Sequence, residues 1–208
     1  TNPILFLNST LAGGVVATNY VGKYAGYRNI LGIDMGGTSF DVCRIDEGSI
    51  SVKFEGNVRG PAQWYGDFPI RIPMVEAESI GAGGGSVAYV EAGMALRVGP
   101  ISMGAEPGPA CYGKGGTEPT VTDAHVVLNS LHSLLGGKIK LDPEVAKKVI
   151  QEKIADPLGL DLIEAADSIL SVVNTNMTVT IRRISVERGY DPRDYVLMAF
   201  GGLGPAHC

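Results

Sequence analysis

The residues best suited to chemistry lie in the stretch Asp-Met-Gly-Gly-Thr-Ser, which begins at Asp34. Gly36 and Gly37 have no Cβ atom, so a phosphate group can lie directly against their backbone N–H groups. The hydroxyls of Thr38 and Ser39 add donors, and Asp34 can hold a hydrated Mg²⁺ ion or orient an attacking water molecule. The stretch therefore predicts a phosphate-binding turn. The alternative is a glycine-rich hairpin in which the aspartate only caps its own turn.

A second glycine corner lies near the end of the sequence, where Ala-Phe precedes Gly201, Gly202, Leu203, Gly204 and Pro205. A buried strand that runs into two glycines and a proline can pass beneath a flat ring, because no side chain obstructs the approach. Alone this pattern is weak, since many strands end in Gly-Gly. Together with the first corner it indicates the adenosine end of a nucleotide site.

Three polar residues outside the corners suggest a divalent-metal site: Asp123, His125 and His207. On a helix, however, Asp123 and His125 point about 200° apart and cannot easily share an ion. We expect Asp123 to cap a helix, and the role of His207, beside the second corner, stays open. Cys111 has no neighbouring base in the sequence, so we expect a buried structural thiol.

The glycine-rich stretch from Gly81 to Ser86 is similar to the G-x-G-x-x-G fingerprint of dinucleotide-binding proteins. Ser86 replaces the third glycine, and an alternating run that is typical of a strand follows, so we exclude that interpretation. Two alternatives stay open: the loop lines the substrate or phosphate site, or it is a tight structural crossing.

Hydrophobic patterning predicts the elements that position these residues. Strands are expected at residues 4–7, 30–34, 39–45, 50–55, 87–91, 95–98 and 195–200, with hairpins at Asp46-Glu47-Gly48 and between the 87–91 and 95–98 runs. The strand at 195–200 is expected to be buried. The segment 56–78 is expected to be irregular, because it holds Pro61, Trp64, Pro69 and Pro73.

Capping patterns predict four helices. The first follows the hydroxyls at Ser9 and Thr10 and runs through residues 24–27. The second begins at Thr120 and ends near residue 131. A third begins at Asp142 and stops before Pro157. The longest runs from Asp161 to about Arg188, where the arginines of the last turns complement the helix dipole.

Composition narrows the classes of function. The chain has 208 residues, 45% of them hydrophobic and 19% charged, which excludes disorder. A net charge of −5 without a basic run argues against a nucleic-acid partner. The sequence lacks an apolar run of about 18 residues and a signal peptide, and its three cysteines are far apart, so we expect a cytoplasmic protein without a membrane span. It begins in a strand-like run without methionine, as a segment of a longer polypeptide would.

The two corners together resemble the second phosphate motif and the adenosine motif of the superfamily that contains actin, Hsp70 chaperones and sugar kinases. Five further stretches resemble the hydantoinase A, 5-oxoprolinase and acetone carboxylase family. They are Ser79-Ile-Gly-Ala-Gly-Gly-Gly-Ser, Leu96-Arg-Val-Gly-Pro, Pro107-Gly-Pro-Ala-Cys-Tyr-Gly, Gly115-Gly-Thr-Glu-Pro-Thr-Val-Thr-Asp and Val186-Glu-Arg-Gly-Tyr-Asp-Pro-Arg-Asp.

The resemblance implies an ATP- and Mg²⁺-dependent enzyme that opens a cyclic amide (hydantoin, N-methylhydantoin or 5-oxoproline) through a phosphorylated oxygen. One alternative is a subunit of an acetone or acetophenone carboxylase, and another is a non-catalytic actin-like assembly lobe. The implied catalytic and metal residue is Asp34. The residues implied to contact the β/γ phosphates are Asp34, Gly36, Gly37, Thr38 and Ser39, and those beside the adenosine are Gly201, Gly202, Gly204 and Pro205.

The resemblance also implies an α/β fold: a single ribonuclease-H-like, actin-like ATPase lobe over residues 1–208, with a mixed sheet, flanking helices and a Gly/Pro-rich insertion at about 56–160. A second Asp-x-Gly-Gly-Thr is absent from the sequence. The implied partners are therefore a missing N-terminal lobe and a hydantoinase B-type subunit, and we expect the isolated segment to be inactive. Phe40 departs from the family's threonine and, on a strand, should point away from Ser39, as a packing change would.

Overall fold

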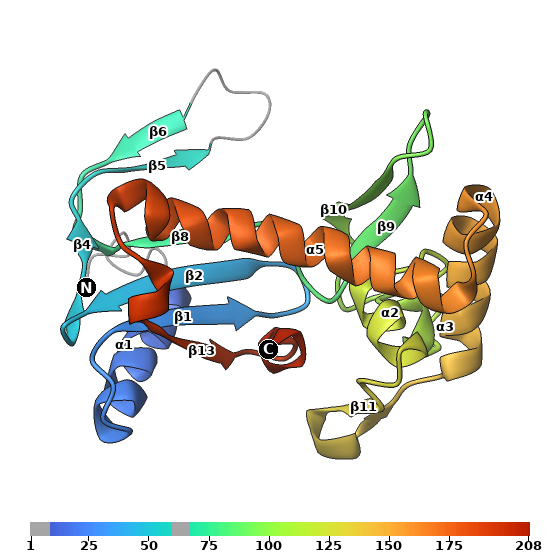
Figure 1. Ribbon diagram of the computed structural model, residues 1–208, viewed down its shortest axis with the longest axis horizontal. Helices are drawn as coiled ribbons and strands as arrows, with labels where there is room; N and C mark the ends of the chain where they lie inside the picture. The colour runs from blue at the N-terminus through green and yellow to red at the C-terminus, as the bar shows by residue number, and fades with distance from the viewer. Residues whose placement is uncertain (1–8, 60–66) are drawn as a thin grey trace. The chain divides into compact units, whose positions relative to one another are not determined.

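The computed structural model describes residues 9–59 and 67–208 (Figure 1). The strand expected at residues 4–7, together with Pro61 and Trp64, lies outside the described residues. By its internal contacts the described chain divides into two compact units. The first unit contains residues 9–32, 42–59, 67–78 and 183–198, and the second contains residues 33–41, 79–182 and 199–208.

The main sheet is mixed and has five strands. Its order is β13–β1–β2–β3, and β8 also pairs with β2. These strands are β1 (Ile30–Met35), β2 (Phe40–Asp46), β3 (Ser49–Ile50), β8 (Ala77–Ile80) and β13 (Val196–Phe200). The expected first hairpin is confirmed, since β2 and β3 pair antiparallel with Ile45 opposite Ile50. By contrast, β13 runs in the same direction as β1 (Figure 1).

The first unit is organised around α1 (Ser9–Tyr24), which confirms the first expected helix. Close packing is built into this helix, because a Cβ atom at Gly32 of β1 would lie 2.8 Å from both Thr18 Cγ2 and Cys43 Sγ. Thr18 and Cys43 are both buried. The small residue at position 32 therefore lets the helix approach the strands.

In the segment expected to be irregular, residues 56–78, the described parts (56–59 and 67–78) instead contain strands, so the prediction is wrong for them. The short strands pair as two separate ribbons, β4 with β7 and β5 with β6. Their bounds are β4 (Val52–Lys53), β5 (Gly56–Arg59), β6 (Asp67–Ile70) and β7 (Met74–Val75). Pro69 is tolerated because β6 belongs to a two-stranded ribbon, where a missing N–H can face outward. The run at 50–55 also divides, because β3 and β4 pair with different partners.

The first unit also contains an ion-pair network that the sequence did not suggest. Arg188 was expected to complement the helix dipole, yet its guanidinium pairs with Glu76 and, at 3.1 Å, with Glu78. Gly189 then ends the turn, donating its N–H to Val186, and Tyr190 donates to Ser185. The 3-10 helices of this unit are Val186–Arg188 and Pro192–Asp194.

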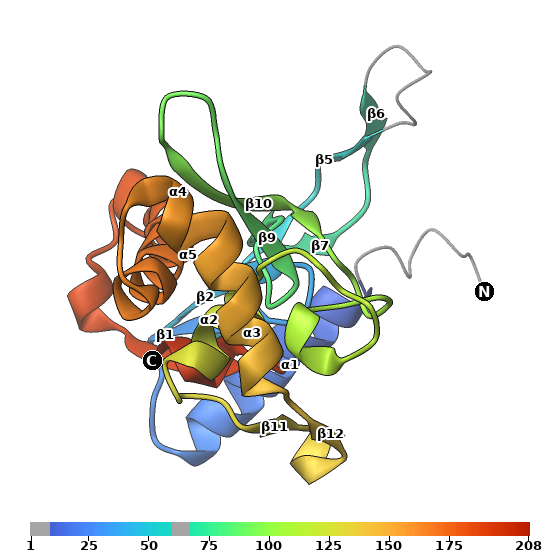
Figure 2. The ribbon, with the colours of Figure 1, turned by 90° about the vertical axis from the view of Figure 1, so that its right-hand side faces the viewer.

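The second unit combines an antiparallel hairpin with a helical group. The hairpin of β9 (Ser86–Val90) and β10 (Leu96–Ser102) is confirmed. The helices α2 (Val121–Val127) and α3 (Pro143–Ile150) lie side by side (Figure 1, Figure 2). The remaining elements are β11 (Ser133–Leu134), β12 (Ile139–Lys140), α4 (Asp156–Leu158), most of α5 (Leu162–Ile184), and 3-10 helices at Ala110–Tyr112, Leu135–Gly137 and Gly204–His207.

Two helix ends in this unit differ from expectation. The third helix does not stop before Pro157, because a π-helical turn at Gln151–Ala155 carries it into α4. The Asp156 N–H bonds Gln151 O in this wider turn, directly before the residue whose ring would crowd an ordinary α-turn. The second helix ends early, at Val127. By contrast, α5 keeps its predicted start, where the Glu164 N–H donates to Asp161 Oδ1 at 2.8 Å.

The strand that leads to the second corner is not buried, contrary to expectation. Val196 and Leu197 of β13 are 37% and 46% exposed. Periodicity alone indicated an apolar strand, but β13 lies at the edge of its sheet among the strands that the structure describes. None of the helices in the described part of the chain is long and apolar enough to cross a membrane.

Candidate functional site

The first corner is a tight turn between β1 and β2. The Gly36 N–H donates to Ser39 O at 3.1 Å, and Gly37 and Thr38 form the exposed tip. A Cβ atom at Gly36 or Gly37 would meet no atom within 4 Å, and neither glycine has a positive φ. Internal packing and backbone conformation therefore do not require glycine here. A ligand that approaches the backbone would require glycine, because a Cβ atom would occupy the space that the ligand needs.

The N–H groups of this tip are available to a ligand. Within the described residues, no acceptor takes a hydrogen bond from the N–H of Gly37 or Thr38. The carbonyl groups, by contrast, are engaged: Gly84 donates to Gly36 O at 2.9 Å, and Gly85 donates to Gly37 O at 2.7 Å. Because the carbonyl groups are held by protein partners and the N–H groups are not, the open side of the turn suits an anion.

The glycine-rich loop from Gly81 to Ser86 packs against this turn, as expected for a tight structural crossing. A Cβ atom at Gly83 would lie only 2.5 Å from the Gly37 carbonyl carbon and the Thr38 nitrogen. Gly83 to Ser86 are buried, and Thr122 Oγ1 donates to Gly84 O at 2.9 Å. The loop is a tight crossing of two backbones that fixes the turn from behind.

The second corner contacts the first. The Leu203 N–H donates to Met35 O at 2.9 Å. Gly201 has a φ of +87°, and a Cβ atom there would collide with Asp34 Oδ1 and lie 2.6 Å from Met35 O. Gly201 is therefore required by both conformation and packing. At Gly202, a Cβ atom would meet nothing within 4 Å, so this glycine too has an open face.

The carboxylate of Asp34 lies at the junction of the two corners. Its partial burial, and secondarily the charge of Asp41, raise the pKa of Asp34 above its ordinary value of 3.8. Ser39 Oγ, expected to be a free donor, donates here to Asp41 Oδ2 at 3.1 Å. Sequence reasoning missed Asp41, whose proximity to Asp34 follows from the hairpin. Two neighbouring carboxylates favour a cation near them.

Asp123 is a helix cap, as expected. Thr120 and Asp123 form a reciprocal capping box at the start of α2. The buried carboxylate accepts from Thr120 Oγ1 at 2.7 Å, Thr120 N at 2.9 Å and Cys111 N at 2.8 Å. Its oxygen atoms are thus committed to the protein. Cys111 is buried, and burial raises the pKa of its thiol, in agreement with a structural role.

The two histidines singled out in the sequence meet in space. Nε2 of His125 and Nε2 of His207 lie 3.2 Å apart, with the rings at 87° to one another. Burial, and secondarily His207, lower the pKa of His125 to about 4, and burial also lowers the pKa of His207. As predicted, the side chains of His125 and Asp123 do not share a partner: Asp123 bonds Cys111 and Thr120, whereas His125 contacts Ser130 and His207. No local sequence signal could have paired His125 with His207, because 82 residues separate them.

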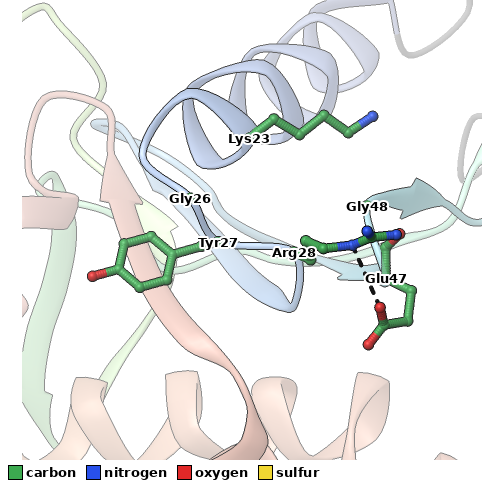
Figure 3. Close-up of a pocket in the computed structure, with 6 residues that line it drawn as sticks. All are labelled: Lys23, Gly26, Tyr27, Arg28, Glu47 and Gly48. Carbon is green, nitrogen blue, oxygen red and sulfur yellow. Dashed lines mark hydrogen bonds and ion pairs between the residues drawn. The ribbon is translucent and has the colours of Figure 1, made fainter.

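Phe40 is completely buried, as expected of a residue that packs in the core. A separate pocket in the first unit contains an exposed ion pair between Arg28 and Glu47 at 3.4 Å (Figure 3). Its lining residues are Lys23, Gly26, Tyr27, Arg28, Glu47 and Gly48, and none of them is a candidate site residue.

The two glycine corners are joined by the hydrogen bond from the Leu203 N–H to Met35 O, and Gly36, Gly37 and Gly202 keep open faces. The sequence matches the hydantoinase/oxoprolinase family over residues 1–208. The chain belongs to this family. Among its relatives are the caprolactamase alpha subunit of Pseudomonas jessenii, 43% identical over 97% of the chain, and the acetophenone carboxylase gamma subunit of Aromatoleum aromaticum, 44% identical over 96%.

Solved structures agree with this assignment. The ATP-dependent caprolactamase of Pseudomonas jessenii matches 93% of the chain with a TM-score of 0.81 and 43% identity. The nucleotide-free structure of acetone carboxylase matches 94% with a TM-score of 0.80 and 35% identity. Both neighbours establish an α/β fold with a mixed sheet. The chain spans only 27% of each of these structures, and 28% and 27% of the two relatives.

Proposed function

We propose that this chain supplies one side of the ATP site of an enzyme that opens a cyclic amide. The contact between the two corners carries the proposal: Leu203 bonds Met35, while Gly36, Gly37 and Gly202 keep open faces. One nucleotide can then lie against both corners, its phosphates on the turn and its adenosine on the strand end. The ATP dependence of the caprolactamase and acetone carboxylase relatives supports this proposal.

The residues divide into two sets by the part of ATP that they contact. The turn holds the β/γ phosphates through its N–H groups and hydroxyls, with Asp34, Gly36, Gly37, Thr38 and Ser39 as contacts. The second corner lies beside the adenosine, with Gly201, Gly202, Gly204 and Pro205 as contacts. The glycine-rich loop keeps the turn rigid, so its N–H groups are oriented before the phosphates arrive.

The residues present fit a Mg²⁺ ion. Asp34 and Asp41 are close enough for the Asp41 charge to raise the pKa of Asp34, and a cation relieves that repulsion. Carboxylate oxygen is the ligand that Mg²⁺ prefers, usually with several retained waters. Asp34 would hold the hydrated ion, which when bound supplies charge neutralisation to the phosphates. The carboxylate of Asp34 also orients the oxygen atom that attacks.

For the reaction, we infer that ATP donates its γ-phosphoryl group to the amide oxygen of a hydantoin, 5-oxoproline or related lactam and leaves as ADP. The phosphorylated amide has a more electrophilic carbon, which water can attack. The caprolactamase relative favours this class, because its name denotes lactam hydrolysis. A second candidate is a ketone carboxylase subunit, favoured by the acetophenone carboxylase and acetone carboxylase relatives. The two candidates share the phosphorylation step and differ in substrate.

We also propose a lobe type, an insertion, partners and a location for this chain. A strand order of β13–β1–β2–β3 with a long helix before β13 supports a single ribonuclease-H-like, actin-like lobe. The insertion at about 56–160, the second lobe, a hydantoinase B-type partner and a cytoplasmic location are further parts of the proposal. The small share of the caprolactamase alpha subunit that the chain spans, 28%, supports a requirement for further polypeptide.

Substrate-stimulated ATP hydrolysis tests the function. The full-length protein should release phosphate faster when hydantoin, 5-oxoproline or caprolactam is added, and the ring should open in step with ATP use. Stimulation by acetone or acetophenone with bicarbonate, and not by the lactams, would select the carboxylase. Nucleotide-dependent assembly without any stimulated hydrolysis would exclude both enzymes.

A further inference from the structure

The neighbours of His125 and His207 allow an arrangement in which the Nδ1 atom of each ring carries a proton. When Ser130 Oγ donates to the His125 backbone carbonyl at 3.1 Å, its lone pairs face His125 Nδ1, 2.8 Å away, and accept the proton of that nitrogen. Asn174 Oδ1 lies 2.7 Å from His207 Nδ1 and accepts in the same way. Both Nδ1 atoms are therefore protonated in the arrangement that satisfies all four groups.

In that arrangement, both Nε2 atoms carry lone pairs, and these atoms lie 3.2 Å apart. Two facing lone pairs repel each other unless a cation lies between the rings. The separation suits such a cation: two nitrogen ligands at about 2.0–2.1 Å from a tetrahedral Zn²⁺ are about 3.3–3.4 Å apart. The near-perpendicular rings at 87° allow both to approach one ion without a clash between their edges.

We propose that His125 and His207 bind a transition-metal ion of the Zn²⁺ class through their Nε2 atoms. Each ligand already has the outer partner that metal-bound histidines need, Ser130 Oγ for His125 and Asn174 Oδ1 for His207. Imidazole favours Zn²⁺, Cu²⁺ or Ni²⁺ over Mg²⁺, so this site is distinct from the carboxylates of the phosphate turn. The described residues offer no group of three His, Cys, Asp or Glu ligands, so water would have to complete the coordination.

The position of the pair suggests what the ion does. His125 belongs to α2, Asn174 to α5, and His207 ends the 3-10 helix Gly204–His207 that follows the second corner. An ion at the pair would connect these three segments of the second unit and hold the corner in place. This inference goes beyond the proposed ATP chemistry and does not depend on it.

Metal titration without nucleotide tests the site. The full-length protein is freed of metal with a chelator and titrated with Zn²⁺ by calorimetry, and then with Co²⁺, whose visible absorption reports nitrogen ligation. His207→Gln is the test variant, because His207 is only partly buried whereas His125 is fully buried. His132→Gln is the matched control, because His132 is the third histidine of the chain and is exposed.

We expect the wild type and His132→Gln to bind one equivalent of Zn²⁺ that His207→Gln does not bind, with at least a 100-fold loss of affinity in the variant. Asn174→Leu should weaken the same equivalent by about 10- to 100-fold, through loss of the outer partner. Equal binding by the wild type and a folded His207→Gln protein would overturn the proposal and would assign the short contact to a proton shared by the two rings. The titration uses no nucleotide, so its result is independent of whether the corners bind ATP.

Discussion

Adding one methyl group at Gly37 should separate ligand binding from folding. In Gly37→Ala, the new Cβ atom meets no protein atom within 4 Å, and the φ is not positive. The free energy of unfolding should therefore change by no more than about 1 kcal/mol, and a rise is possible because alanine restricts the unfolded chain. The methyl group does, however, occupy the space next to the N–H groups that we assign to phosphate.

The loss of affinity can be estimated from one hydrogen bond. A hydrogen bond to a charged group contributes about 1.5–3 kcal/mol, so displacing one phosphate oxygen should weaken ATP binding about 10- to 150-fold. Calorimetric titration of the full-length protein with a non-hydrolysable ATP analogue measures this. Urea unfolding of the same samples measures stability.

Gly83→Ala is the matched control, because its Cβ atom would lie 2.5 Å from backbone atoms of Gly37 and Thr38. It should destabilise folding by about 1–3 kcal/mol through overpacking, in contrast to Gly37→Ala. If Gly37→Ala binds the analogue as tightly as the wild type, the phosphate assignment is wrong. If it loses as much stability as Gly83→Ala, the turn has no open face.

Three other variants test neighbouring parts of the account. Asp34→Asn should lower turnover at least about 100-fold without loss of stability in urea. Because the pKa of Asp34 is raised in the folded protein, the stability that this group contributes is present below its ordinary pKa of 3.8 and is lost as the pH rises through the raised pKa. The free energy of unfolding of the wild type should therefore fall relative to that of the variant over this pH window, and identical pH profiles would contradict this. Asp123→Ala should lower the free energy of unfolding, measured in urea, by about 3 kcal/mol or more, because the buried donors at Cys111 and Thr120 lose their acceptor. A change below about 1 kcal/mol would show that water replaces the carboxylate as the acceptor. Arg188→Met should lower the free energy of unfolding by about 1 kcal/mol, because the ion pairs that it removes are partly exposed. Additive effects in a double-mutant cycle with Glu78→Gln would refute the pairing.

Local sequence patterns predicted several helix starts and turns. The capping residues Thr120 and Asp123 act within one turn of helix, so their spacing alone was enough to place α2. The same holds for Asp161 at α5 and for the turn after Asp46. Such signals depend on neighbours in the chain, which the sequence shows directly.

Features that depend on distant partners could not be obtained in this way. Gly201 contacts Asp34, and His125 contacts His207, only because the chain folds back on itself. The sequence indicated that the glycine corners belong together by type, but not that Leu203 bonds Met35. The exposure of β13 was likewise missed, since an apolar run does not show whether its strand lies at an edge.

A structure of the full-length protein with a bound non-hydrolysable ATP analogue tests the central claim most directly. We predict phosphate oxygens within hydrogen-bond distance of the Gly37 and Thr38 N–H groups, and the adenosine against Gly202. A nucleotide bound elsewhere, with both glycine corners in contact only with water, would contradict the account.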